Sequence, residues 1–526
     1  MPYSRQSVGF RQSGPQPWLV IVLCAVYLLA GVIGHDPWKS EDAIHLGIAQ
    51  SLLTGGDWLT PTLAGEAWPD AEPLYHWLAM ATASISTAFL PFHDGARLAS
   101  ALFGGLFLVM LAGAARRLYG KEAGWGAPLL AIGTLGLLVP IHEAQPAAAI
   151  LATMGILYLG AAMIAERPIA GAVVMGSGLG ASFLAGGANA VLPLLPLLLV
   201  PLGQRRWQAF AVALTVTSLI IAAWPLLLSW QHPDFLNAWW AAEKSLIAPR
   251  GGFSSNHAEW IGWFAWPVLF IAPWALWRGR HQLSAPPIAV PLLGLVAAMA
   301  WFLTHEAKNQ ASLPLLPPLI LLAAAAVANL RRGAANAWDW FGMMTLSLFA
   351  VLIWLGSIAM QTGWPPKIAR NFAKLEPGFV AEFSLVAMLA ALLATAAWIL
   401  VLWKLPRSPW RVASRWAAGV TVVWVLVTAL WMPWIDYGKT YRPVIASLRQ
   451  ALPNDPGCIG QREVGAPQRA ALDYFGGLRT QRTSRNCSWL IVQGGPREIT
   501  QEGWTKAWEG HRPGDRNEWL RLYRRD

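Results

Sequence analysis

Long apolar runs recur along almost the whole chain, and they constrain its fold more than any other feature. They are residues 17–34, 97–118, 123–140, 146–165, 169–185, 188–203, 208–230, 260–277, 287–304, 311–330, 338–361, 380–403 and 413–434. Each run is long enough, or nearly so, to cross a hydrocarbon core of about 30 Å as a helix. Only 13% of the 526 residues are charged, against about 25% in an average soluble domain. The sequence therefore predicts a polytopic α-helical membrane protein with about 13 transmembrane helices.

Lysine and arginine residues cluster between the apolar runs, and these clusters predict the topology. They are Arg116, Arg117 and Lys121; Arg205 and Arg206; Arg278 and Arg280; Arg331 and Arg332; and Lys404, Arg407, Arg411 and Arg415. Basic loops stay in the cytoplasm, and all these clusters lie on the N-terminal side only if a further apolar stretch, 74–92, does not span. We therefore expect 74–92 to lie along the periplasmic surface. The protein should cross a bacterial inner membrane many times, with a cytoplasmic N-terminus and a periplasmic C-terminus.

The start of the chain and its net charge agree with this topology. Arg5 and Arg11 precede the first apolar run, and no convincing cleavage site follows that run, so we expect a retained helix. The net charge of +11 comes from basic residues between apolar runs. This distribution is typical of a topology signal rather than of a nucleic-acid surface. Membrane lipids, and no nucleic acid, are therefore expected as partners.

The chain divides into two expected domains. Residues 1–435 form the transmembrane domain, which includes a first periplasmic loop at 35–96, and residues 436–526 form a soluble periplasmic domain. Helix-like and strand-like segments follow one another in this tail: 443–452, 467–475, 489–492 and 519–523. Such a mixture indicates a small α/β domain. No nucleotide-binding glycine motif is present in it.

Two of the three cysteines, Cys458 and Cys487, lie in the tail. The periplasm is an oxidising compartment, so a disulfide between them is expected if the tail is periplasmic. The alternative is two buried free cysteines in separate elements.

The first periplasmic loop has the pattern of a helix lying on the membrane. Ser40 is suited to cap its start, and Glu41 and Asp42 fall in the first turn, where negative charge is favourable. Apolar residues then recur every four positions at Ile44, Ile48 and Leu52. Taken alone, the two acids are equally well explained as ordinary helix-capping residues.

Several short motifs together resemble one enzyme family. In the first loop they are Glu41-Asp42, Gly56-Asp57-Trp58, Pro61 and Pro73-Leu74-Tyr75-His76-Trp77, and in the segment after it they are Arg97-Leu98 and Ser100-Ala101-Leu102. Further along they are Phe235-Leu236, Glu243, Arg250, His257, Trp260, Pro273-Trp274, Lys308, Pro314, Pro317 and Asp436 to Pro443. This set resembles the GT-C membrane glycosyltransferases, and most closely the branch that includes the lipid A aminoarabinose transferase and the protein mannosyltransferases (glycosyltransferase families 39 and 83). The sequence departs from that pattern at Ala71, where the family has a basic residue, and at Gln145, where it has an acid.

The resemblance implies the GT-C fold and a transfer reaction at the periplasmic face. The donor would be a polyprenyl-phosphate sugar, and the acceptor a lipid A-like or other envelope glycolipid, or a protein. A carboxylate is needed as general base for the acceptor hydroxyl, and Glu41 or Asp42 matches the family's position. Cations are needed for the leaving phosphate, and Lys308 and Arg250 are the candidates. The alternative for both cations is anchoring at the membrane interface.

Seven more residues are possible substrate contacts, by their place in the outer loops or in the family pattern. They are His45, Asp57, Tyr75, Glu143, Gln145, Glu243 and His257. His45 lies one turn from Glu41, so the two side chains could pair or share a metal. No multi-ligand metal spacing is present, so no metal or other cofactor is predicted to be required.

Two other classes of function fit the same span count. A transporter or lipid flippase should place ionisable residues in the middle of the membrane at broken helices. Here the acids gather at one face, which favours the enzyme. A catalytically degenerate family member with a binding or scaffolding role is the other alternative, because Ala71 and Gln145 depart from the pattern.

Overall fold

The computed structural model describes residues 14–39, 41–249, 251–252, 254–482, 487–497, 501–515 and 517–526. Two of the expectations above fall outside these residues, the N-cap at Ser40 and the phosphate contact at Arg250.

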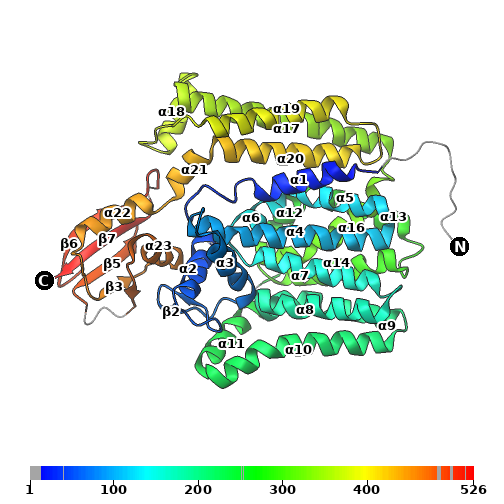
Figure 1. Cartoon of the computed structure of the whole chain (residues 1–526), viewed down its shortest axis with the longest axis horizontal. Helices are drawn as coiled ribbons and strands as arrows, with labels where there is room; N and C mark the ends of the chain where they lie inside the picture. The colour runs from blue at the N-terminus through cyan, green and yellow to red at the C-terminus, as the bar shows by residue number, and fades with distance from the viewer. Residues whose placement is uncertain are drawn as a thin grey trace.

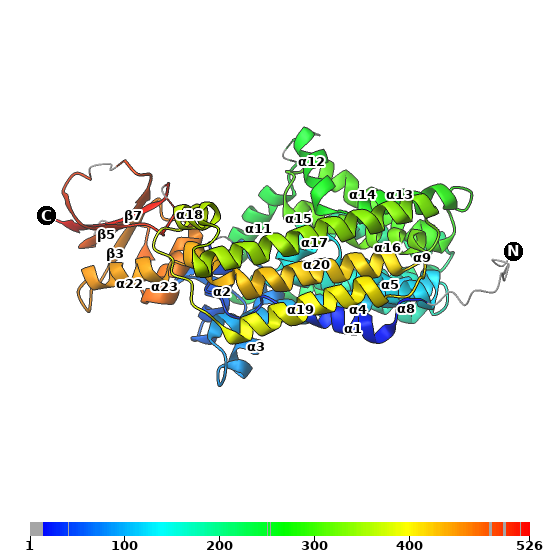
Figure 2. The same cartoon turned by 90° about the horizontal axis from the view of Figure 1, so that it is seen from above.

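Long helices packed side by side make up most of the molecule (Figures 1 and 2). They are α1 (Pro17–Leu29), α4 (Phe92–Tyr119), α5 (Lys121–Ile132), α7 (Ala147–Met163), α8 (Pro168–Val191), α10 (Trp207–Gln231), α13 (Val268–Gly279), α14 (Pro286–Thr304), α16 (Leu316–Val327), α17 (Arg332–Thr362), α19 (Leu385–Lys404) and α20 (Arg411–Leu430). Shorter pieces join them: η1 (Leu135–Leu137), α6 (Leu138–His142), η2 (Leu192–Leu199), α9 (Val200–Gly203), α11 (Pro233–Ile247), α12 (Ser255–Phe264), α15 (Asn309–Ser312), η3 (Leu313–Leu315), α18 (Pro366–Leu375) and α21 (Met432–Lys439).

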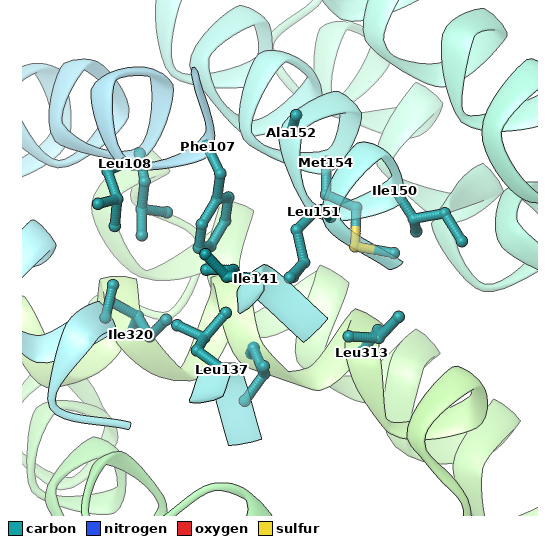
Figure 3. Close-up of a cluster of buried hydrophobic side chains, with 14 of the residues drawn as sticks. Phe107, Leu108, Leu137, Ile141, Ile150, Leu151, Ala152, Met154, Leu313 and Ile320 are labelled. Carbon is teal, nitrogen blue, oxygen red and sulfur yellow. The ribbon is translucent and has the colours of Figure 1, made fainter. Parts of the chain in front are cut away.

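The centre of the bundle is a close-packed apolar core. Figure 3 shows Phe107 of α4 beside Ile141 of α6, with Leu151 of α7 and Ile320 of α16 nearby. The outer helices instead expose large apolar side chains, such as Leu393 of α19, which is 71% exposed. A helix that is apolar on its exposed face as well as its buried face is typical of a membrane span. The expected polytopic helical membrane fold is confirmed.

Within the described residues, eight helices are long and apolar enough to cross a membrane, or ten if each of two bent pairs counts as one span. The shorter helices α1 and α7 are also apolar. The count of about 13 spans stays a prediction. Helix α3 (Pro73–Ser86) is not among these candidates and lies beside α2 (Glu41–Leu53) at one end of the bundle (Figure 1). This position agrees with a surface location for residues 74–92.

The stretch from Pro168 to Gly203 runs back on itself. Helices α8 and α10 are parallel, because Gly176 of α8 lies against Ala213 and Gly180 lies against Ile220. The chain must therefore return between them, through η2 and α9. Non-helical backbone at Gly186 and Gly187 divides α8 close to that turn. The predicted runs 169–185 and 188–203 are thus two separate passes.

Two predicted runs are not straight helices. The run 123–140 bends by 70° between α5 and η1, and the run 260–277 bends by 92° between α12 and α13. At the second bend Pro267 has no backbone N–H to continue the helix. The two bends meet, because the N–H of Leu135 donates to the carbonyl of Trp266 at 3.1 Å. This hydrogen bond satisfies one polar backbone group at each bend inside the bundle.

The C-terminal domain is a five-stranded sheet with two helices, α22 (Arg442–Ala451) and α23 (Ala466–Gly476). Its strands are β3 (Ile459–Arg462), β4 (Thr480–Gln481), β5 (Trp489–Gly494), β6 (Trp504–Gly510) and β7 (Trp519–Arg525), in the order β4-β3-β5-β7-β6. Strand β3 is parallel to β4 and β5, and β7 is antiparallel to β5 and β6. The small α/β domain is confirmed. Strands β3, β4 and β6 were not predicted from the sequence.

This domain lies at the same end of the bundle as α2 and α3 (Figure 1). Helix α23 contacts α2, where Ala470 packs against Ile48 and Leu63. The structure joins Cys458 and Cys487 in a disulfide. The fold therefore brings the first loop, which contains the hairpin of β1 (Thr62–Leu63) and β2 (Glu66–Ala67), against the tail of the chain.

Candidate active site

A polar cavity of about 400 Å³ opens where the first loop meets α7, α8 and α11. Its polar lining residues are Glu41, His45, Asp70, Glu72, Asn189, Ser245 and Gln310. Trp68, Ile150 and Met154 contribute apolar walls. No lysine or arginine of the described residues lines it. The site is therefore rich in carboxylates and can supply a base and hydrogen-bond partners for a sugar.

Glu41 and His45 lie one turn apart on α2 and face this cavity. The Glu41 side chain is 53% exposed, whereas that of His45 is only 6% exposed. Glu41 Oε2 lies 3.0 Å from His45 Nε2, and His45 Nδ1 lies 2.9 Å from His76 Nε2. His76 Nδ1 donates to the backbone carbonyl of Glu72 at 2.7 Å. These contacts form a chain from the cavity to the start of α3.

The donor and acceptor properties of these groups determine where the protons lie in the hydrogen-bonded series Glu41–His45–His76. A carbonyl oxygen only accepts, so the hydrogen of His76 is on Nδ1, and burial lowers the pKa of His76 to about 3, which keeps it neutral. His76 Nε2 must then accept from Nδ1 of His45. One more proton has to lie between His45 Nε2 and the Glu41 carboxylate, because two lone pairs would otherwise face each other. The hydrogen bond from His45 lowers the pKa of Glu41.

Asp42, the other predicted base, has a different environment. It is fully buried and accepts from Arg97 at 2.7 and 3.0 Å, from the N–H of Ala144 at 2.8 Å and from the N–H of Trp38 at 3.1 Å. Burial alone would raise the pKa of Asp42, but the Arg97 guanidinium outweighs it and holds that pKa at about 2. The geometry therefore separates the two neighbours, with Glu41 in the cavity and Asp42 inside the protein.

The start of the tail is bonded to the first loop. Asp436 accepts from the indole of Trp38 at 2.7 Å and from the N–H of Asp36 at 2.9 Å. The carboxylate of Asp36 accepts from Thr440 at 2.7 Å and from Arg442 Nε at 2.8 Å. The segment from Asp436 to Pro443 thus holds the loop in place beside Asp42.

A second pair of acids consists of Glu72, which lines the cavity, and Glu243, which interacts with Glu72 but does not line it. Glu72 accepts from the indole of Trp239 at 3.2 Å, and burial, followed by the nearby charge of Glu243, raises the pKa of Glu72 to about 8. Glu243 is 2% exposed and accepts from the N–H of Asn189 at 2.6 Å, and burial raises its pKa as well. Glu72 is therefore protonated at neutral pH and can donate a hydrogen bond to a ligand.

Lys308, a predicted phosphate contact, does not line the cavity, and neither does His257. Lys308 is 73% exposed and pairs with Glu306. It lies two residues before Gln310, which does line the cavity. His257 is buried, and its Nε2 lies 2.8 Å from the carbonyl of His305.

Two predicted substrate contacts in the first loop have structural partners. Asp57 lies 2.6 Å from His232 Nε2 and so links the loop to the end of α10. Tyr75 is fully buried and lies 2.8 Å from Ser100 Oγ.

Two further predicted contacts lie between α6 and α7. Burial, followed by the charge of Asp42, raises the pKa of Glu143 to about 7. Gln145 is buried and donates to the carbonyl of Val139 at 3.3 Å. Neither lines the cavity, although Pro146 does.

Asp70 and Glu72 line the cavity but were not predicted from the sequence as site residues. A signal was present, since both acids immediately precede the helix opened by Pro73. Arg97 was noted only as part of a motif, although it is the cation that satisfies Asp42. Ala71 is 1% exposed and packs in the same apolar cluster as Ala470 of the tail. A small residue at 71 therefore lets the C-terminal domain dock closely.

In the part of the chain that the structure describes, no group of three or more histidine, cysteine, aspartate or glutamate side chains is arranged to hold a metal ion.

No protein-family model matches the chain. Among curated proteins it is 26% identical over 441 residues to an undecaprenyl phosphate-alpha-4-amino-4-deoxy-L-arabinose arabinosyl transferase of Pseudomonas paraeruginosa. That match covers 79% of this chain and 75% of the relative. A protein of the same description from Serratia proteamaculans is 23% identical over 391 residues, covering 69% of each chain.

The crystal structure of ArnT from Cupriavidus metallidurans bound to undecaprenyl phosphate superposes with a TM-score of 0.68 at 18% identity. The superposition covers 96% of this chain and 97% of ArnT. The resemblance predicted from the sequence is therefore confirmed. The chain is a homologue of these arabinosyl transferases and has the GT-C glycosyltransferase fold that ArnT has.

Proposed function

We propose that the chain is an inner-membrane glycosyltransferase that moves a sugar from a polyprenyl-phosphate donor to a lipid A-like envelope acceptor at the periplasmic face. The similarity to arabinosyl transferases named for undecaprenyl phosphate aminoarabinose supports this donor class. The single observation that carries the proposal is the cavity in which Glu41 and His45 face Glu72 and Asp70. This combination of a cavity-facing base and hydrogen-bonding acids suits transfer of a polyhydroxylated group.

In this mechanism Glu41 removes the proton from the acceptor oxygen as that oxygen attacks the anomeric carbon. The bond between the anomeric carbon and the phosphate oxygen breaks, and polyprenyl phosphate leaves with the bonding electrons. The proton passes to the Glu41–His45 pair. His76 accepts from Nδ1 of His45 and so holds the ring with its Nε2 toward Glu41, as a positioning residue does in other catalytic sites.

The aminoarabinose named in the relatives' descriptions fits the chemistry of the cavity. Its amino group is a cation at neutral pH. The described lining offers Glu41 and Asp70 as acidic partners and the protonated carboxyl of Glu72 as a hydrogen-bond donor, with no lysine or arginine. Paired opposite charges in a partly buried site favour such a sugar over a neutral one. We assign the leaving phosphate to Lys308 and Arg250, of which Lys308 is exposed and able to swing toward the cavity edge at Gln310.

The test is sugar transfer by purified protein in nanodiscs. Undecaprenyl-phosphate aminoarabinose and lipid A are the substrates, and mass spectrometry of the lipid A fraction is the readout. Addition of one aminoarabinose by the wild-type protein is expected, and the Glu41→Gln variant should lose it. Lipid A unchanged by folded wild-type protein, with envelope lipids identical in cells with and without the gene, would instead favour a degenerate or transport role.

A further inference from the structure

A second cavity, of about 530 Å³, lies between the hairpin of the first loop and the sheet of the C-terminal domain. Three arginines line it, Arg462 from β3, Arg469 from α23 and Arg482 just after β4. Trp68 of the first loop forms another wall. The cavity is therefore shared by the two domains and is basic where the first cavity is acidic.

Arg469 is the central cation of this site. Its side chain is only 3% exposed, and its Nη2 lies 2.8 Å from Glu66 Oε2. Even so, neither its Nε nor its Nη2 makes a hydrogen bond of good geometry with any residue that the structure describes. Buried N–H groups without acceptors are costly. These two atoms are buried, so an anion in the cavity would stabilise this guanidinium through its charge.

The surrounding charges leave this cation only partly neutralised. Glu66 is shared, because Arg482 Nε also approaches its carboxylate, at 3.3 Å. Arg462 donates to the neutral amide of Gln501. Glu463 is the one carboxylate among the described lining residues. Of the two carboxylates near the three guanidiniums, Glu66 pairs with both Arg469 and Arg482. The 73%-exposed Arg482 can turn toward a ligand.

Trp68 lines both cavities, so the two are neighbours. A ligand with a sugar part and an anionic part could place the first beside Glu41 and the second beside Arg469. The donor is an unsuitable occupant for the basic cavity, because its phosphate carries the polyprenyl chain and has to stay at the bundle. An acceptor glycolipid has a headgroup large enough to reach the soluble domain.

We propose that the basic cavity formed by Arg462, Arg469 and Arg482 binds the phosphorylated saccharide headgroup of the acceptor glycolipid. The identification of the ligand as the acceptor rests on the proposed function. The binding chemistry itself, guanidinium groups with a phosphate monoester, requires no turnover. The C-terminal domain is then a docking module that orients the acceptor oxygen toward Glu41.

The experiment measures binding to the full-length protein in nanodiscs without donor. The probe is a soluble phosphorylated glucosamine disaccharide, compared with the same disaccharide after dephosphorylation and with inorganic phosphate. Arg482→Gln should weaken probe binding about three-fold and Arg469→Gln about ten-fold, because each removes a charged hydrogen-bond donor. Glu66→Gln should instead tighten binding, because it removes the carboxylate that competes for both arginines.

Arg479→Gln is the matched control, since Arg479 is an exposed arginine of the same domain that pairs with Asp473 outside the cavity. The Arg479→Gln variant should bind the phosphorylated disaccharide with the same affinity as the wild-type protein. Should Arg469→Gln fail to fold, Arg482→Gln and Glu66→Gln still decide the question. A salt bridge that merely holds the domains together predicts the same sign for Glu66→Gln and Arg482→Gln, and that outcome overturns the proposal.

The probe arms separate the sources of the anion. Preference for the phosphorylated disaccharide over inorganic phosphate supports a headgroup site, whereas equal binding of the two overturns it. Headgroup binding without any sugar transfer would contradict the proposed function but not the anion site. Sugar transfer with an unchanged KM for the acceptor in Arg482→Gln and Glu66→Gln would contradict the anion site alone.

Discussion

The guanidinium of Arg97 lies 2.7 Å from a carboxylate oxygen of Asp42, and neither side chain is exposed to solvent. The same carboxylate accepts backbone hydrogen bonds from Trp38 and Ala144. Asp42 thereby joins the first loop to the start of α4 and to the loop before α7. Its neighbour Glu41 is left to face the cavity with His45.

Substitutions at positions 41 and 42 should therefore fail in different ways. Glu41→Gln should fold normally and lose about 10²–10⁴-fold in turnover, the usual effect of removing a general base. Asp42→Asn should lose stability, because it breaks a buried ion pair and leaves Arg97 with Asp94 alone as its carboxylate partner, at a cost of up to about 3–5 kcal/mol. Thermal unfolding and transfer rates of both purified variants distinguish these effects. A stable, active Glu41→Gln protein would remove Glu41 from the mechanism.

His45 is expected to act through Glu41. His45→Phe keeps a buried ring but removes both nitrogen atoms, so Glu41 loses the hydrogen bond that lowers its pKa. The pKa of Glu41 should rise, and the acidic limb of the pH–rate profile should move to higher pH. The matched control is Tyr75→Phe, which changes a neighbouring buried ring of the same loop that does not line the cavity. An acidic limb that stays in place would show that His45 does not tune Glu41.

The raised pKa of Glu72, about 8, makes stability depend on pH. The folded protein holds a proton on Glu72 that the unfolded chain releases near its ordinary pKa of 4.5. The contribution of this group to the free energy of unfolding is therefore fully present at acid pH and is lost as pH rises toward 8. Between pH 5 and 8 the melting temperature of Glu72→Gln should fall less than that of the wild-type protein, by about the contribution of one titrating group. Glu143→Gln, whose group has a pKa raised to about 7, gives a comparison outside the cavity. An unchanged slope in Glu72→Gln would contradict the buried protonated acid.

The sequence was sufficient for the helical bundle and the small α/β tail, because apolar length and the signals for helices and strands are local. It could not decide between Glu41 and Asp42. Successive residues on a helix point about 100° apart, and the deciding partner, Arg97, is distant in the chain. Likewise Arg469 and Trp68 meet only because α23 docks on α2. Such long-range contacts carry no local signal.

The disulfide between Cys458 and Cys487 should stabilise the tail. It closes a sequence separation of 29 residues, which corresponds to about 3–4 kcal/mol in the chain-entropy model. Replacing both cysteines by serine should lower the melting temperature of the protein, whereas Cys24→Ser, which alters a cysteine outside the bond, should change it less. Non-reducing peptide mapping of protein from native membranes is the direct measurement. Two free tail thiols in that map would refute the bond.

Topology is the prediction on which the location of the reaction depends. If residues 74–92 lie on the surface, the loops after Arg117 and Arg332 are both cytoplasmic, because basic residues stay on that side. Reporter fusions after each residue should then show cytoplasmic activity, and a fusion after Asp526 should show periplasmic activity. The structure gives this test a physical basis, since α2, α3 and the C-terminal domain lie together at one end of the bundle and the first turn of α1 lies toward the other (Figure 1). A periplasmic signal at Arg117 would overturn this topology. Asp42 pairs with Arg97 at the start of α4, whereas Arg117 is at the end of that helix, so Glu41, the tail and the proposed reaction would then lie on the cytoplasmic face.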